Sequence, residues 1–317
     1  MNVVNIVPMP PSSRPPPSTW PPPETPHVTV LKDEVVNAVC PRAGGVYADC
    51  TLGAGGHTEA LLAAGAGHVI GFDRDETALA LARRRLERFA PRVDFVHAPF
   101  SRLGAELNRL GMDRLDGVVA DLGVSSMQID DPSRGMSFRG VGPIDMRMDP
   151  SGGETARDLI ERLDVDALTE LIGRLGEERR ARRVARCIKE ALAAGRLETT
   201  SDLRRAVVKA VGPSRQGNVD PATRTFQALR IAVNTELHEL DQLIDAAATA
   251  LRDGGVVAII SFHSLEDRIV KRKLREAPSS WHLRGKKPVV VSEAERVENP
   301  RARSAKLRVA SRVARET

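Results

Sequence analysis

The chain has 317 residues and a formal net charge of +5, and aromatic residues make up only 3% of it. This length is enough to bury a large core, either in one domain or in one domain with an insertion. Its three cysteines lie far apart and its seven histidines show no ligand spacing, which excludes a disulfide framework and a recognisable metal motif. The longest apolar run, VVAII from Val256, is too short to span a bilayer, so we expect a soluble, cytoplasmic protein.

The first 26 residues hold ten of the 21 prolines. Proline lacks a backbone N–H and cannot extend a helix or a sheet ladder, so this segment is predicted to be a disordered or polyproline tail. From residue 27 the text HVTVLKDEVVN predicts a short extended piece and a helix that ends before Pro41.

The stretch from Val46 to Asp73 predicts a strand, a glycine loop, a helix and a second strand, the opening of a doubly wound α/β sheet. Asp73 stands at the carboxyl end of the second strand, where an acid can bind ribose hydroxyls. A dinucleotide fingerprint starting at Gly53 requires glycine at position 58, which is Thr58, so a pyrophosphate is not favoured. S-adenosylmethionine has a ribose and an adenine but no phosphate and suits this loop; a purely structural turn is the alternative.

The next elements continue the pattern. A helix is predicted over residues 75 to 89, capped by Asp75, and a third strand over residues 93 to 97. Phe100 lies just past that strand, where it could stack on a flat base or serve as a core aromatic. Residues 116 to 122 predict a fourth strand, which brings Asp121 to the same rim as the acid of the second strand.

The alternation of strands and helices then stops. From Gly123 to about Pro221 the sequence predicts a polar, turn-rich link followed by helices, including the basic stretch RLGEERRARRVARCIKEAL. We predict an α/β fold with a Rossmann-like sheet, formed by residues 27–130 and 222–317, and an inserted, mostly helical domain of residues 131–221 that recognises the substrate.

The last part of the chain returns to the sheet. After residue 222 we predict a long amphipathic helix in one or two parts, ended by Gly254 and Gly255, and a fifth strand in VVAIISFHS. Residues 280 to 303 are predicted to be a loop, followed by a strand near residues 306 to 313. From Arg268 onward 15 Lys and Arg stand against 5 Glu, which favours a polyanion partner over a merely solvated charged face.

Several long blocks stand in order over about residues 27 to 315: CTLGAGGHT, GFDRD, APFS, DLGVSSMQID, RGMSFR, GPIDMRMDP, GEERRARRVARCI, SFHSLEDRIVK and ENPRARSAKLR. Together they resemble the bacterial RsmH (MraW) methyltransferases, although Met127 stands where that family often has proline. The resemblance implies a class I S-adenosylmethionine-dependent methyltransferase fold. It also implies methyl transfer to the exocyclic N4 amine of a cytidine in the decoding region of 16S ribosomal RNA.

The resemblance also implies a set of cofactor contacts: Gly55, Gly56 and His57 in the loop, Asp73 on the ribose, Phe100 near the adenine, and Asp121 and Gln128 beside the methionine part. Strand ends alone had indicated Gly55, Asp73, Phe100 and Asp121, whereas Gln128 and the role of His57 come from the resemblance. The implied partner is 16S ribosomal RNA within the small subunit. We expect no metal, no membrane and no DNA.

The cytosine amine that accepts the methyl group is a weak nucleophile. The exocyclic nitrogen of cytosine shares its lone pair with the ring, so its hydrogens must be held by acceptors while it is aligned with the methyl group. The base must also be unpaired or flipped out. The residue that orients the amine stays open among five candidates: Asp121, Ser125, Ser126, Asp145 and His263.

Because aromatic residues are scarce, RNA is expected to be bound through its phosphates by Arg and Lys. The candidate surfaces are the helix segment Arg179–Arg186 and the segment Arg284–Arg308, although an exposed charged face remains an alternative for the helix. The rival functions are a DNA or protein methyltransferase and a non-catalytic RNA-binding protein. A dehydrogenase is disfavoured by Thr58.

Overall fold

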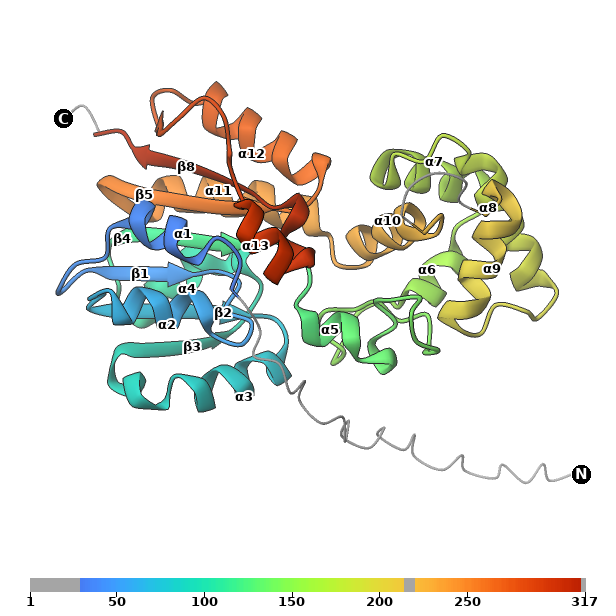
Figure 1. Cartoon of the computed structure of the whole chain (residues 1–317), viewed down its shortest axis with the longest axis horizontal. Coiled ribbons are helices and arrows are strands. Elements are labelled where there is room, and N and C mark those ends of the chain that lie inside the picture. The colour runs from blue at the N-terminus through green and yellow to red at the C-terminus, as the bar shows by residue number, and fades with distance from the viewer. Residues whose placement is uncertain (1–28, 214–219, 315–317) are drawn as a thin grey trace, which may run out of the picture.

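The structure is a computed structural model that describes residues 29–213 and 220–314, so the proline-rich segment predicted to be a tail lies outside the described residues. Figure 1 shows two lobes, a sheet flanked by helices and a smaller group of helices. Within those two ranges, none of the helices combines the length and the apolar character that a membrane span requires.

The larger lobe is built on a sheet to which the described residues contribute eight strands, in the order β3-β2-β1-β4-β5-β8-β6, with β7 also paired to β8. The first five strands run parallel, whereas β8 is antiparallel to its neighbours. The bounds are β1 Val46–Asp49, β2 His68–Asp73, β3 Val93–His97, β4 Leu115–Asp121, β5 Leu251–Ser261, β6 Trp281–Leu283, β7 Val289–Val290 and β8 Lys306–Arg312.

Helices cover both faces of this sheet, as Figure 1 shows. One face is covered by α1 (Lys32–Val39), α2 (Gly56–Ala63) and α3 (Glu76–Arg85), and the other by α4 (Leu103–Leu110), α11 (Glu236–Ala250) and α12 (Ser264–Glu276). Successive strand residues point to opposite faces, so Val119 packs in the first core and its neighbour Val118 in the second. Apolar residues on both faces explain why these strands are continuous apolar runs. The predicted Rossmann-like α/β class is confirmed.

The strand order reverses between β1 and β4, because the chain adds β2 and β3 on one side of β1 and later adds β4 on the other. In open α/β sheets the crevice at such a reversal, outside the carboxyl ends of the strands, is where ligands bind. The glycine loop after β1 and the last residue of β4, Asp121, both lie at this edge.

The smaller lobe consists of α6 (Ala156–Arg162), α7 (Val165–Gly176), α8 (Ala181–Ala193), α9 (Thr200–Val211) and α10 (Thr223–Val233). Side chains of Thr155, Asp164 and Thr199 cap the starts of α6, α7 and α9. The helices share one apolar core, in which the ring of Phe138 packs edge-on against Phe226 with centroids 5.3 Å apart. This lobe has a core of its own.

The lobe extends beyond the predicted boundary at residue 221. Helix α10 packs on α7, and its Phe226 and Leu229 are buried in the core of the smaller lobe. The chain returns to the sheet only at α11, after Thr235 adopts a left-handed backbone conformation with φ of 49°. The predicted long helix is therefore two helices that belong to different lobes.

Three local predictions were wrong. Helix α3 ends at Arg85, and Pro91 falls within a 3-10 turn over Glu87–Arg92, because proline cannot continue an α-helix. Helix α11 ends at Ala250, so Gly254 lies inside β5, next to an irregularity in its pairing with β4.

The third concerns residues 280 to 303, which are not a loop. They contain β6, β7 and α13 (Glu293–Glu298). The two short strands pair with β8, so their conformation is fixed by the strand beside them and not by a local pattern. The remaining short elements are α5 (Ser126–Asp130) and the 3-10 turns Phe100–Arg102, Pro132–Arg134 and Pro300–Ser304.

Candidate active site

A cavity of about 330 Å³ lies at the carboxyl ends of the parallel strands, and both lobes line it. The glycine loop, the ends of β2, β4 and β5, and α5 form the side of the sheet lobe, whereas Gln227 and Arg230 of α10 come from the smaller lobe. Six of the seven predicted cofactor residues line this cavity: Gly56, His57, Asp73, Phe100, Asp121 and Gln128. Of these, Asp73, Phe100 and Asp121 had been indicated by their positions at strand ends.

The seventh, Gly55, is not among the lining residues. Its φ is 85°, and a Cβ there would lie 3.0 Å from the side chain of Leu86, so the loop packs closely on α3 at this point. At Gly56 a Cβ would lie 2.0 Å from Oγ1 of Thr29. A side chain at either glycine would clash with its neighbour, so both positions allow the loop to pack closely against the rest of the protein.

Asp73 ends β2 at the rim of the cavity. Its Oδ2 accepts the backbone N–H of Gly53 and its Oδ1 accepts that of Asp75, each at 2.8 Å. Burial raises the pKa of Asp73 to about 6, although these two amide hydrogen bonds oppose the shift. The carboxylate thus fixes the glycine loop to the start of α3 and titrates close to neutrality.

His57 is buried beneath the cavity between two carboxylates. Its Nε2 lies 3.6 Å from Oδ2 of Asp121, and the fully buried Asp49 accepts a hydrogen bond from the hydroxyl of Thr58 at 2.8 Å. Burial disfavours the charged ring, but Asp121 and Asp49 together raise the pKa of His57 above its ordinary value. Within the described ranges, both ring nitrogens of His57 and Oδ1 of Asp121 lack hydrogen-bond partners. Buried polar atoms without partners are expected where a ligand supplies them.

Phe100 begins the 3-10 turn after β3, between the core and the cavity. Its ring is partly buried against the core and also lines the cavity. The guanidinium of Arg74 lies 5.9 Å from the ring centre, and Arg74 also donates to the carbonyl of Asn234 at 3.0 Å. The aromatic ring is thereby held at the rim from two sides.

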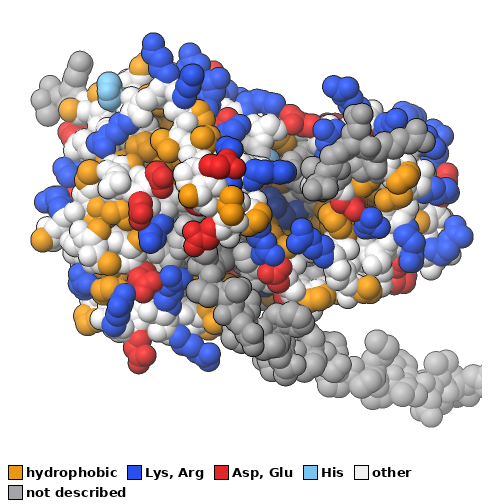
Figure 2. Space-filling model, in the orientation of Figure 1, with side chains coloured by type: hydrophobic (Ala, Val, Ile, Leu, Met, Phe, Trp, Pro, Cys, Tyr) orange, Lys and Arg blue, Asp and Glu red, His pale blue; other side chains and the backbone are white. Residues whose placement is uncertain are grey.

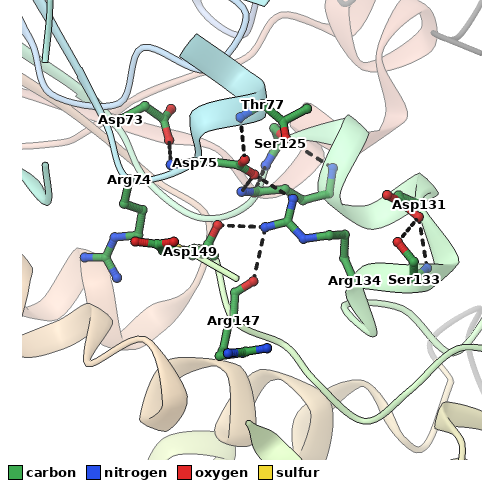
Figure 3. Close-up of polar contacts among 12 residues, drawn as sticks. Asp73, Arg74, Asp75, Thr77, Ser125, Asp131, Ser133, Arg134, Arg147 and Asp149 are labelled. Atoms are coloured by element: carbon green, nitrogen blue, oxygen red, sulfur yellow. Dashed lines mark hydrogen bonds and ion pairs between the residues drawn. The ribbon is translucent and has the colours of Figure 1, made fainter. Parts of the chain in front are cut away.

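The side chain of Gln128 is buried, and both ends of its amide are used. Oε1 accepts the backbone N–H of Ser125 and Nε2 donates to Oδ2 of Asp75, each at 3.0 Å. Arg134 donates to the same carboxylate at 2.6 Å, and Figure 3 shows it pointing from the segment after α5 toward Asp75 at the start of α3. Asp75, predicted only as a helix cap, therefore also ties the link between the lobes to the sheet.

The structure separates the five candidates for orienting an amine. Four line the cavity: Asp121, Ser125, Ser126 and His263. Asp145 is not among the lining residues, and its carboxylate binds Arg147 at 2.7 Å. The hydroxyl of Ser125 accepts the backbone N–H of Gln128 and caps α5.

One charged group in the cavity wall was missed from the sequence. Arg230 donates two hydrogen bonds to Glu236, at 2.7 and 2.8 Å, and His263 and Glu266 lie beside them. Ligand atoms of Glu236, His263 and Glu266 lie within 4.8 Å of one another, so these three could also hold a metal ion. The sequence did contain a sign of this charged group: Arg230 stands inside the apolar run LRIAV, and a charge on a buried helix face needs a partner.

The predicted RNA-binding surfaces are exposed in part. Exposed arginines of α8 include Arg182, Arg183 and Arg186, and Lys286 and Lys287 are exposed between β6 and β7. Figure 2 shows Lys and Arg side chains spread over both lobes and near the junction between them. Other basic residues of the C-terminal segment have structural partners: Arg301 binds Asp130 at 2.6 Å and Arg308 binds Asp267 at 2.7 Å.

Solved structures with a similar fold include an rRNA methylase from Streptococcus thermophilus, with 10% identity, a TM-score of 0.42 and coverage of 89% of this chain and 93% of that one. A Streptococcus mutans protein in complex with SAH has 12% identity, a TM-score of 0.45 and coverage of 90% and 99%. These TM-scores are low, so the fold class rests on the strand order of the sheet itself.

Sequence relatives are much closer. The chain is 61% identical over 316 residues to the Ribosomal RNA small subunit methyltransferase H of Sorangium cellulosum, covering 99% of this chain and 98% of that protein. It is 49% identical to the protein of the same name from a Synechococcus strain, covering 90% and 92%. The sequence model of the MraW methylase family matches residues 24–313. The chain therefore belongs to the MraW methylase family.

Proposed function

We propose that the protein is an S-adenosylmethionine-dependent methyltransferase that modifies the exocyclic N4 amine of a cytidine in 16S ribosomal RNA of the small subunit. Family membership and the names of its relatives support the reaction and the RNA. The observation that carries the proposal is one cavity with Asp73 and Asp121 at the ends of β2 and β4, the two strands on either side of β1, and a wall from a second lobe.

The residues of the cavity fit the cofactor. Gly56 brings backbone without a side chain to the cavity wall, Asp73 offers a carboxylate to the ribose, and Phe100 offers a ring to the adenine. The ring nitrogens of His57, which have no hydrogen-bond partner among the described residues, are available to the remaining, methionine part. When bound, S-adenosylmethionine supplies a methyl group on a cationic sulfur.

The protein contributes alignment and a place for the proton. Alignment of two reactants can supply about 7 to 11 kcal/mol of the barrier, which matters most for a weak nucleophile such as the cytosine amine. Oδ1 of Asp121, which is buried and has no hydrogen-bond partner within residues 29–213 and 220–314, accepts one hydrogen of the amine and takes that proton once the nitrogen has been methylated. Residues of both lobes line the cavity, and a base and cofactor bound between them would displace water from the reacting atoms.

The amine is reached only in an unpaired or flipped base, so the rest of the protein must hold an irregular RNA shape. The exposed arginines of α8 and the exposed pair Lys286 and Lys287 are the groups expected to bind its phosphates. Such contacts position the RNA without reading its sequence.

The proposal is tested with purified protein, S-adenosylmethionine and small-subunit particles lacking the modification. Mass spectrometry of the nucleosides should show N4-methylcytidine at one position. Equal transfer to naked DNA, or transfer to a protein, would favour the rival methyltransferases. If calorimetry detects no binding of S-adenosylmethionine, the protein is a non-catalytic RNA-binding protein.

Asp73→Ala is expected to weaken the binding of S-adenosylmethionine by about 1 to 3 kcal/mol, because the ribose hydroxyls lose their acceptor in a buried place. The loop also loses the hydrogen bond from Gly53. Calorimetry measures the affinity. Asp94→Ala, on the neighbouring strand β3 but not among the cavity residues, is the control and should leave the affinity unchanged.

The affinity for S-adenosylmethionine is expected to fall as the pH falls through about 6, the pKa of Asp73 in the free protein. Ribose hydroxyls bind the ionised carboxylate, so below this pH binding must first remove a proton, whereas above it no proton is lost. The affinity should drop by up to about tenfold per pH unit on the acid side. Calorimetry across this range measures the profile, and Asp73→Asn should flatten it; a flat profile for the unaltered protein contradicts the assignment.

Reversing the charges of Lys286 and Lys287 to Glu is expected to weaken RNA binding and to lower the slope of log affinity against log salt by at least about one unit. The cofactor affinity should not change, because neither residue lines the cavity. Filter binding at several salt concentrations measures the slope. Reversal of Arg83 and Arg84, exposed near the end of α3, is the matched control; an equal effect there would show that only the net charge matters.

A further inference from the structure

The charged group formed by Arg230, Glu236, His263 and Glu266 has no role in the steps above. It joins the end of α10, the start of α11 and the start of α12 in the cavity wall. The side chains of Glu236 and Glu266 are 9% and 3% exposed. Burying charges is costly unless they are paired, and such groups concentrate at functional sites.

The hydrogen bonds of His263 define which ring nitrogen carries the hydrogen. Nδ1 accepts the backbone N–H of Glu266 at 3.4 Å as part of the cap of α12, so the hydrogen of the neutral ring is on Nε2. Nε2 is buried and has no hydrogen-bond partner in the part of the chain that the structure describes. It lies 3.2 Å from Oε1 of Glu266, without the alignment that a hydrogen bond requires.

Glu266 supplies a hydrogen-bond acceptor beside this donor. Its Oε2 accepts the backbone N–H groups of Phe262 and His263, at 2.8 and 3.2 Å. Burial acts to raise the pKa of Glu266, but His263 and Arg230 outweigh it and hold the pKa below its usual value. The carboxylate is therefore ionised, and its Oε1 is an acceptor beside the Nε2–H donor.

We propose that these two atoms read the edge of the target base, with Nε2–H of His263 donating to N3 of cytosine and Oε1 of Glu266 accepting one hydrogen of its N4 amine. The inference rests on the proposed function and adds the groups that select the base. The second amine hydrogen remains for Asp121, at the end of the adjacent strand β4.

Base selection follows from the hydrogen-bond pattern. Uracil carries a hydrogen on N3 and an oxygen in place of the amine, so it would set donor against donor and acceptor against acceptor. A site with buried hydrogen-bonding groups rejects such a mismatch strongly, because its own polar atoms are left unpaired. The charge of Arg230, which binds Glu236, lowers the pKa of Glu266 and leaves Oε1 of Glu266 free of a hydrogen bond from Arg230.

The test uses small-subunit particles that carry either cytidine or 3-deazacytidine, which has a C–H in place of N3, at the methylated position. The unaltered protein should lose about 10- to 100-fold in kcat/KM on the 3-deazacytidine particle, the effect of one buried hydrogen bond. His263→Ala should show a similar loss on cytidine and little further loss on 3-deazacytidine. Such non-additivity identifies two partners of one interaction.

His282→Ala, an exposed histidine of β6, is the matched control and should behave as the unaltered protein. The proposal would be overturned if the 3-deazacytidine particle and His263→Ala each lowered kcat/KM independently, so that the two losses multiplied. It would also be overturned if the unaltered protein had equal kcat/KM on both particles. This second comparison does not require that His263→Ala folds. Binding of Mn²⁺ or Zn²⁺ that disappears in His263→Ala would assign the cluster to a metal and also overturn it. Failure of the unaltered protein to methylate cytidine would instead reject the proposed function itself.

Discussion

Asp121→Ala is expected to lower kcat for methyl transfer by about 100-fold or more, the usual contribution of a positioned proton acceptor. The carboxylate ends β4 at the reversal of strand order, and its Oδ1 is buried without a partner in the described ranges. Its removal leaves the amine without an acceptor and also removes the negative charge 3.6 Å from His57. We expect kcat to fall more than the affinity for S-adenosylmethionine.

Single-turnover assays with saturating cofactor separate the two effects. Asp121→Asn keeps an acceptor oxygen but cannot take up the proton, so its rate should lie between those of the alanine variant and the unaltered protein. Asp94→Ala removes a carboxylate from the same sheet away from the cavity and should leave kcat unchanged. A value of kcat for Asp121→Ala within about threefold of the unaltered protein would assign the proton to another group.

Arg230→Met is expected to lower the free energy of unfolding by about 3 to 5 kcal/mol, the typical cost of leaving a buried charge without its partner. The substitution keeps most of the apolar stem. Arg230 makes two hydrogen bonds to Glu236, and the side chains are 16% and 9% exposed. Its charge also lowers the pKa of Glu266, so two carboxylates would lose compensation.

Urea unfolding followed by circular dichroism measures the loss. Arg230→Met combined with Glu236→Gln should be more stable than Arg230→Met alone, because the second change removes the uncompensated charge. Arg182→Met breaks an ion pair with Asp166 whose side chains are 68% and 77% exposed, and should have no measurable effect. Equal losses for Arg230→Met and Arg182→Met would contradict the role given to burial.

The sheet could be predicted because its signals are local. Continuous apolar runs mark strands buried on both faces, and Asp75 marks the start of α3 through its side-chain cap. Once these strands are taken as parallel, their last residues must share one edge. Asp73 and Asp121 were therefore placed at the site by topology, without knowledge of any contact.

What could not be predicted depends on partners distant in the sequence. The two residues of β7 form a strand only because β8 lies beside them. The amphipathic pattern of α10 does not say which lobe its apolar face meets. Gln128 needs Asp75, 53 positions earlier, to fix its amide, and no spacing rule connects them.

Asp75 has a wider consequence. Its backbone N–H binds the carboxylate proposed for the ribose, while its side chain holds Arg134 at the entry to the smaller lobe. A shift of this single residue on cofactor binding would be passed to the lobe that we propose binds the RNA. Thermodynamic linkage then makes the coupling reciprocal: by whatever factor the cofactor changes the affinity for RNA, RNA changes the affinity for the cofactor by the same factor.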